Sequence, residues 1–171
     1  ATCDGAFYQG KNVMVIGGGN SAVEEALFLT RYAKKVSIVH RRDQLRADKI
    51  LSEKALTHPQ IYFFWHSVVE EIKGEKTVHE VVLKDLATNK KLMVPTDGVF
   101  IYIGSKPNSE LVKGLVRRDE KGYILTDENM KTSSPRIFAA GDVRAKPLRQ
   151  IVTAVSDGAI AAEAARQVIE K

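Results

Sequence analysis

Short apolar runs alternate with amphipathic stretches over the first third of the chain. The runs at residues 13–16, 36–39 and 61–65 are typical of strands covered on both faces in a parallel sheet. Between them, the spacing of apolar residues predicts helices over residues 21–33 and 47–56. This β-α-β-α-β succession with short connections predicts a right-handed, doubly wound α/β sheet of the Rossmann kind.

A different pattern follows the third predicted strand. Residues 68–72, 78–85 and 91–94 read as a small antiparallel meander added to the parallel sheet. Residues 99–103 are apolar throughout and are expected to form a fully buried strand that ends at Gly104. Since ligands bind beyond the carboxyl ends of parallel strands, Ile103 and Gly104 are candidate residues of a binding crevice.

This rhythm breaks near residue 105, where we place a domain boundary. Beyond it we expect strands at residues 122–125 and 136–142, and a helix over residues 151–169. The small residues of that helix imply close contact with another element. These few elements cannot form a sizeable core by themselves. We therefore expect this segment to need a partner segment.

A glycine-rich loop directly follows the first predicted strand. Its sequence, G-G-G-N-S-A at residues 17–22, fits the pattern G-x-G-x-x-A. In this pattern Gly17 permits a tight turn, Gly19 lets the backbone approach a pyrophosphate, and Ala22 allows close packing of helix on strand. Asn20 and Ser21 lie where the helix N-terminus directs its N–H groups at the loop. The stretch predicts a dinucleotide site.

The end of the second predicted strand indicates which dinucleotide binds. An NAD site places an acidic residue about 20 residues past the glycines, whereas this chain has His40, Arg41 and Arg42 there, followed by Arg46. A carboxylate repels a 2′-phosphate, and guanidinium groups bind it through paired hydrogen bonds. The cluster therefore predicts NADP(H), with a solvated basic turn as the alternative.

Charge and hydropathy exclude several other classes. The 26 basic and 21 acidic residues give a net charge of +5, too evenly spread for a nucleic-acid surface, which needs a broad basic face with aromatic platforms. No apolar run approaches the length of a membrane span, and no signal-peptide pattern is present. We therefore expect no membrane association and a cytoplasmic location.

Cysteine and histidine usage is sparse. One cysteine excludes an internal disulfide, and four scattered histidines show no metal-ligand spacing, so no metal site is expected. The chain begins abruptly at Ala1 without a methionine. We therefore expect that an upstream segment is missing.

Four motifs in order resemble the thioredoxin reductase family of flavin-dependent disulfide oxidoreductases, and the match covers essentially the whole chain. The start, A-T-C-D-G, looks like the tail of that family's C-A-T-C-D-G redox motif. The loop at residues 17–22 resembles its NADPH loop, and residues 40–46 resemble its H-R-R-x-x-x-R motif. The stretch A-A-G-D-V at residues 139–143, with R-Q at 149–150, is similar to its flavin motif.

The resemblance implies a domain organisation and a flavin site. Residues 1–105 would be an NADP(H)-binding domain with a remnant of the redox motif, and residues 106–171 the C-terminal part of a split FAD-binding domain. The N-terminal FAD segment and the first cysteine of the redox pair would precede Ala1. The implied FAD-binding residues, which would contact the ribityl chain and the isoalloxazine, are Asp142, Val143, Arg149, Gln150 and Ile151.

The resemblance also assigns a reaction. Cys3 would be the cysteine of the pair that receives electrons from FAD, and Asp4 the neighbouring acid-base group. Electrons would pass from NADPH through FAD and the cysteines to thioredoxin, in an enzyme that is a homodimer when intact. Alternatives are a peroxiredoxin-reducing flavoprotein, a ferredoxin or flavodoxin NADP reductase, or a non-redox NADP(H)-binding module.

Overall fold

The computed structural model of the chain describes residues 1–170. These residues form two compact units that meet in the sequence between Gly104 and Ser105. The first unit begins with a short 3-10 helix, η1 (Gly5–Tyr8), and holds all the regular strands among the described residues. Each unit has its own core, so we describe them separately.

A four-stranded parallel sheet forms the centre of the first unit. Its strands are β1 (Asn12–Ile16), β2 (Lys35–Val39), β3 (Ile61–Phe64) and β7 (Gly98–Ile101), in the order β3-β2-β1-β7. β1 is central and pairs with β2 and β7 in parallel. The expected parallel α/β sheet is therefore confirmed.

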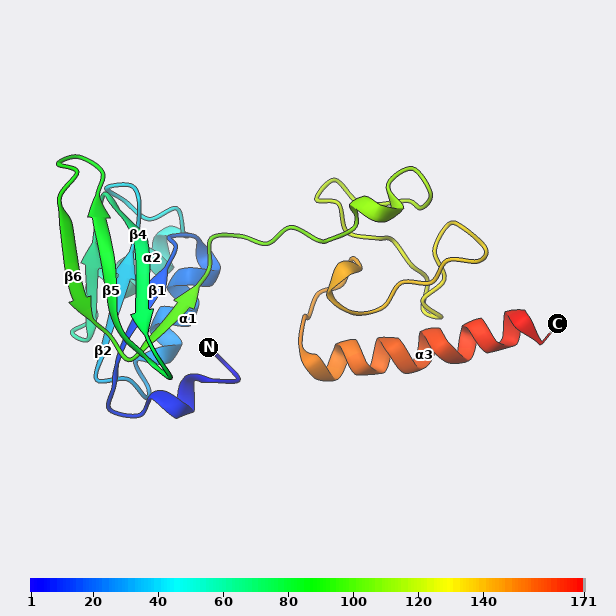
Figure 1. The fold of residues 1–171 in the computed structure, drawn as a ribbon, viewed down its shortest axis with the longest axis horizontal. Coiled ribbons are helices and arrows are strands. Elements are labelled where there is room, and N and C mark those ends of the chain that lie inside the picture. The colour runs from blue at the N-terminus through cyan, green and yellow to red at the C-terminus, as the bar shows by residue number, and fades with distance from the viewer. Residues whose placement is uncertain (171) are drawn as a thin grey trace. The chain divides into compact units, whose positions relative to one another are not determined.

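Two helices and a second sheet cover the two faces of the parallel sheet (Figure 1). Helices α1 (Asn20–Leu29) and α2 (Lys49–Leu56) contribute to the core on one face. The antiparallel strands β4 (Ser67–Gly74), β5 (Val78–Asp85) and β6 (Lys91–Pro95) form a separate sheet, whose core lies on the other face. The expected meander is therefore a layer of its own.

The alternation of β1 explains why its sequence is apolar throughout. Val13 and Val15 pack in the core with the helices, whereas Met14 packs with Val81 and Leu83 of β5. Successive side chains of a strand point to opposite faces, and both faces of β1 are covered. Continuous hydrophobicity follows from burial on two sides.

The strand β7 is less buried than its sequence predicts. It ends at Ile101, and Ile101 and Ile103 are 58% and 72% exposed. The expectation of a fully buried strand over residues 99–103 is wrong, because β7 lies at the edge of the parallel sheet. An edge strand has a neighbour on one side only.

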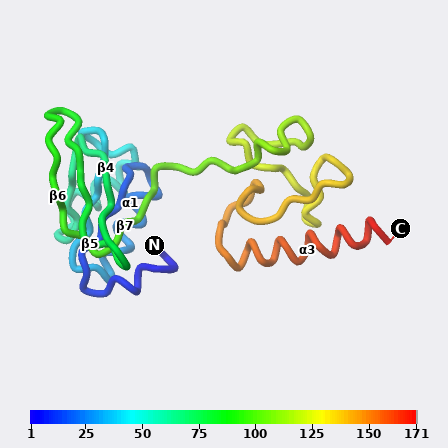
Figure 2. Tube along the Cα trace, viewed as in Figure 1, coloured from blue at the N-terminus to red at the C-terminus, as the bar shows by residue number. Residues whose placement is uncertain are grey.

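The second unit contains 3-10 turns and one long helix. These elements are η2 (Glu110–Val112), η3 (Gly141–Val143) and α3 (Ile151–Ile169), which runs along the loops of this unit (Figure 2). The prediction of strands at residues 122–125 and 136–142 is wrong. Only isolated bridges form, at Ile124 and at Phe138.

Regular strands do not form among the described residues of the second unit because its core is small. This core consists of Val116, Ile124 and Ala139, with a few partly buried neighbours. Helix α3 buries only Asp157 and Ala164, so most of its apolar side chains stay exposed. Without a broad apolar surface to pack on, extended segments gain little from regular pairing.

Candidate functional site

The glycine loop connects β1 to α1 at the carboxyl edge of the parallel sheet. Gly17 has φ +145°, a conformation that residues with a side chain rarely adopt. A Cβ at Gly17 would lie 2.4 Å from the carbonyl oxygen of Tyr102 and 2.9 Å from the Cβ of Ala22. The loop therefore passes tightly between the end of β7 and the first turn of α1.

The next two glycines differ in their surroundings. A Cβ at Gly18 would lie 2.5 Å from the imidazole of His40, while one at Gly19 would meet no heavy atom within 4 Å. The carbonyl oxygen of Gly18 accepts hydrogen bonds from the backbone N–H groups of Arg46 (2.6 Å) and Ala47 (3.1 Å). The basic loop after β2 thus folds over Gly18 and leaves Gly19 accessible.

A cavity of about 460 Å³ opens beside this loop, at the carboxyl ends of β1, β2 and β7. Five of the residues proposed from the sequence line it: Gly17, His40, Arg41, Arg46 and Ile103. The lining residues that the sequence reasoning missed are Ile16, Gly18, Val39, Ser67, Val68, Val69, Ile72, Ile101 and Tyr102. Those from β4 carry no local signal, since they reach the cavity through the packing of the two sheets.

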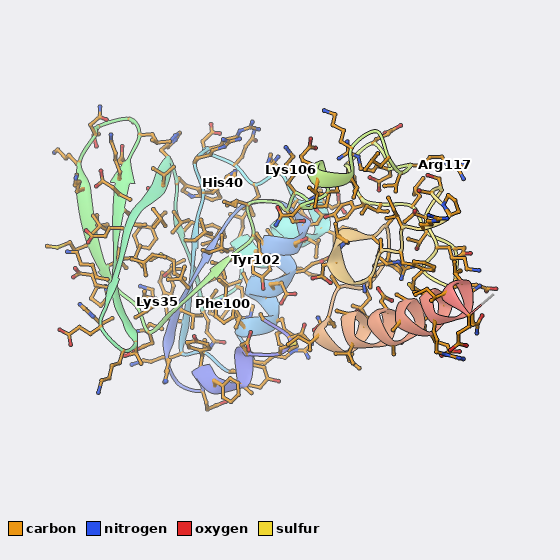
Figure 3. All side chains as sticks on the ribbon, turned by 45° about the vertical axis from the view of Figure 1, so that its right-hand side comes forward. Lys35, His40, Phe100, Tyr102, Lys106 and Arg117 are labelled. Carbon is orange, nitrogen blue, oxygen red and sulfur yellow. The ribbon has the colours of Figure 1, made fainter. Side chains whose placement is uncertain are left out.

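His40 and Ser67 are the buried polar residues among those that line the cavity. His40 follows β2, at the end opposite to Lys35 (Figure 3), and is 5% exposed. Burial lowers the pKa of His40 below its usual 6.5, as do the charges of Arg46, Arg42 and Arg41, against a hydrogen bond with the backbone of Gln44. The imidazole is therefore neutral at pH 7.

The three arginines of the basic loop are exposed. Arg41 and Arg46 line the cavity, whereas Arg42 does not. Among the ion pairs of residues 1–170, none involves Arg41, Arg42 or Arg46. Two positive charges that line the cavity and a third on the same loop, with no ion pair to an acidic side chain among the described residues, favour the binding of an anion.

Asn20 connects the glycine loop to the second helix. Its side chain donates to Asp48 Oδ2 (2.8 Å), and its Oδ1 accepts from the backbone N–H of Asp48 (2.9 Å). Asp48 was missed from the sequence, although its position before α2 is that of a helix cap. Ser21, Ala22 and Gly104 do not line the cavity; Ala22 is buried in the core.

Cys3 and Asp4 lie in the exposed turn before η1. Neither lines the cavity. Burial, followed by the charges of Glu25 and Asp4, raises the pKa of Tyr102 to about 12. Asp4 therefore acts electrostatically on the tyrosine at the rim of the cavity.

Among the proposed flavin-contacting residues of the second unit, Arg149 contacts Asp142. Its guanidinium lies 4.0 Å from the ring centroid of Tyr123, and its Nε donates to the carbonyl oxygen of Asp142 (3.3 Å). Gln150 caps α3 in a reciprocal arrangement with Thr153. Val143 packs beside the core of this unit, and Ile151, the first residue of α3, is 84% exposed.

Sequence reasoning missed a buried ionic cluster around Asp157. This carboxylate accepts from Arg144 Nη1 (2.8 Å), from Lys146 Nζ (2.8 Å) and from the backbone N–H of Gly141 (3.0 Å). All three side chains are nearly inaccessible. The available signal was an aspartate among small and apolar residues in the first half of the predicted helix.

Metal-binding clusters and membrane-spanning helices are both absent from residues 1–170. No group of three or more His, Cys, Asp or Glu side chains in that range is arranged to hold a metal ion. None of the helices described there combines the length and hydropathy needed to cross a membrane.

A glycine loop at the carboxyl edge of a parallel sheet, facing a basic loop after the second strand, is the arrangement with which α/β proteins bind dinucleotides. The family model described as pyridine nucleotide-disulphide oxidoreductase matches residues 2–158. The chain belongs to this family.

Similar proteins are named thioredoxin reductase. Those of Peptoclostridium litorale and Bacillus subtilis are 51% and 50% identical over the whole of this chain, which covers 56% and 54% of them. The crystal structure of thioredoxin reductase from Streptococcus pyogenes MGAS5005 matches with a TM-score of 0.88 and 50% identity, over 98% of this chain and 55% of that one. The chain spans about half the length of the curated relatives it matches.

Proposed function

We propose that this chain is the pyridine nucleotide-binding part, with a flavin-contacting segment, of an NADPH-dependent thioredoxin-disulfide reductase. The observation that carries this proposal is the pair of arginines, Arg41 and Arg46, which line a cavity beside a glycine loop and form no ion pair within residues 1–170. The relatives named thioredoxin reductase support the choice of reaction.

The nucleotide fits the residues of the first unit. The open space at Gly19 and the N-terminus of α1 suit a diphosphate, which backbone N–H groups and the helix dipole stabilise. Arg41, Arg42 and Arg46 would hold the 2′-phosphate through charge-assisted hydrogen bonds.

The flavin part of the proposal concerns the second unit. Asp142 and Ile151 are exposed, and Arg149 is held by Tyr123 and by the carbonyl of Asp142. These residues, with Val143 and Gln150, would contact one end of FAD. When bound, FAD supplies the two-electron carrier between the nicotinamide and a disulfide.

Two exposed residues would take part in the thiol chemistry of the proposed reaction. Cys3 would be the sulfur that exchanges electrons with the flavin, and Asp4 would exchange protons with the thiols. These 171 residues contain one cysteine, so the second thiol has to come from outside this sequence. Thioredoxin as the substrate, a homodimeric enzyme and a cytoplasmic location are further parts of the proposal, based on the family resemblance.

The nucleotide assignment is tested by calorimetric titration of the chain with NADPH and NADH. We expect tighter binding of NADPH. Arg41→Ala or Arg46→Ala should weaken NADPH about tenfold or more, since each charge-assisted hydrogen bond contributes about 1.5–3 kcal/mol, and should leave NADH unchanged. Arg31→Ala, at an exposed arginine outside the cavity, is the control. Equal affinities for the two nucleotides would contradict the proposal.

The reductase assignment is tested by following NADPH oxidation with oxidised thioredoxin and added FAD. We expect no turnover by residues 1–171, because resolving a mixed disulfide requires a second thiol. A longer protein that adds a second cysteine and the remaining FAD segment should be active, and Cys3→Ser should abolish that activity while NADPH affinity is retained. Full activity of that variant would refute the role of Cys3.

A further inference from the structure

The imidazole of His40 is fixed in the wall of the nucleotide cavity. Its backbone N–H donates to the carbonyl oxygen of Phe64 (2.9 Å), and its own carbonyl oxygen accepts from the N–H of Ser67 (3.0 Å). The ring lies against Gly18 and packs edge-on to Trp65, with ring centroids 6.5 Å apart. Backbone and side chain are therefore both held in place.

One nitrogen of this ring has no partner. The Nε2 atom of His40 is buried and finds no hydrogen-bonding group among residues 1–170. Leaving a buried polar atom unsatisfied costs about 1–3 kcal/mol, and such atoms in native proteins call for an explanation. Since His40 lines the anion-favouring cavity, an oxygen of a bound ligand is the partner that this nitrogen can gain.

The charges that act on this ring are all positive. Arg41, Arg42 and Arg46 lie on the loop after β2, and each lowers the pKa of His40, after the larger effect of burial. The neighbours from the other elements, Gly18 and Trp65, are uncharged. A bound phosphate would offset the three guanidinium charges, so it would remove part of what keeps the imidazole neutral.

We propose that His40 is a proton-linked phosphate contact, in which Nε2 bonds a phosphate oxygen of the bound nucleotide while the imidazole takes up one proton from solvent. This inference rests on the proposed nucleotide-binding function and adds a pH response to it. The His40 contribution to binding is then largest at low pH. It is lost as the pH rises through the pKa of His40 in the complex.

The decisive measurement is the number of protons taken up on binding, from calorimetry of the chain in buffers of different ionisation enthalpy. With NADP⁺, His40→Gln should lower this number by about half a proton or more near pH 6.5. The 2′-phosphate contributes to the total in both proteins, and the difference between them measures the protons linked to His40, including its coupling to the phosphate. His79→Gln, at an exposed residue of β5, is the matched control and should keep the wild-type value.

The choice of ligands identifies the phosphate. NAD⁺ carries the diphosphate without the 2′-phosphate, and 2′-AMP carries the 2′-phosphate without the diphosphate. If the His40-dependent proton uptake occurs with 2′-AMP but not with NAD⁺, the contact is with the 2′-phosphate. If it occurs with NAD⁺ but not with 2′-AMP, the contact is with the diphosphate. Either result supports the proposal.

A second measurement avoids any change in the protein. The pKa of the His40 imidazole, followed by NMR in the wild-type chain, should rise when NADP⁺ is added. An unchanged pKa, or wild-type proton uptake in His40→Gln, would overturn this inference and leave the nucleotide function intact. Failure of all three ligands to bind would overturn both.

Discussion

Gly17 and Gly19 belong to one loop but are required for different physical reasons. Gly17 has a left-handed φ and no room for a side chain beside the carbonyl of Tyr102. Gly19 has extended backbone angles and empty space where a Cβ would be. The first glycine serves the fold, and we assign the second to ligand access.

We expect alanine substitutions to separate these two roles. Gly17→Ala should lower the free energy of unfolding by about 1–3 kcal/mol or more, through backbone strain and a steric clash. Gly19→Ala should leave stability within about 0.5 kcal/mol and weaken NADPH about tenfold, because its methyl group would occupy space next to the diphosphate. Urea denaturation followed by the fluorescence of Trp65, together with nucleotide titration, tests both. Equal stability losses would contradict this assignment.

At the scale of elements, Asp157 connects α3 to the η3 turn and the loop after it. Burial by itself raises the pKa of this carboxyl, but the hydrogen bonds from Lys146, Arg144 and the backbone of Gly141 bring the pKa below the usual 3.8. The folded pKa is therefore lower than the unfolded one. The resulting stabilisation is present above about pH 4 and is lost as the pH falls through the folded pKa.

We expect Asp157→Asn to loosen this unit. The change leaves Arg144 and Lys146 buried without a counter-charge, which costs about 3–5 kcal/mol for buried pairs. Glu163→Gln on the same helix removes an exposed pair with Arg166 and should cost less than about 1 kcal/mol. Hydrogen exchange at the amides of residues 141–146 is the measurement. Similar protection in the two variants would show that the buried cluster is not what holds the turn.

At the scale of the whole molecule, the cavity proposed to bind the nucleotide belongs to one unit. All of its lining residues fall between Ile16 and Ile103, and the first unit ends at Gly104. The core of that unit is complete within the same residues. Nothing in the second unit is needed to form the lining.

Residues 1–104 alone are therefore expected to bind NADPH as the whole chain does, within about threefold, or about 0.7 kcal/mol. The comparison is made by titrating both proteins under the same salt conditions, because contacts between phosphate and arginine are screened by salt. The separate unit should also unfold in one cooperative step. An affinity loss greater than about tenfold would show that the second unit contributes to the site.

The amino-acid sequence alone determined the parallel sheet, the two helices on it, the antiparallel meander and helix α3. These elements follow from local patterns: apolar runs, helical spacing, and a glycine loop between strand and helix. They are readable because a buried strand or an amphipathic helix shows its burial in its own residues. The positions of Gly17 and Ala22 at the tight turn follow from the same local chemistry.

Only the tertiary structure determined which segments far apart in the sequence contact one another. The antiparallel strands became a separate layer because Met14 and Val81 supply matching apolar faces. His40 is buried under Gly18, and no local sequence pattern predicts that contact. The carboxylate of Asp157 pairs with Arg144 and Lys146, which precede it by 13 and 11 residues. Such outcomes depend on which surfaces meet, and contacts between segments far apart in the chain leave no periodic trace in either segment.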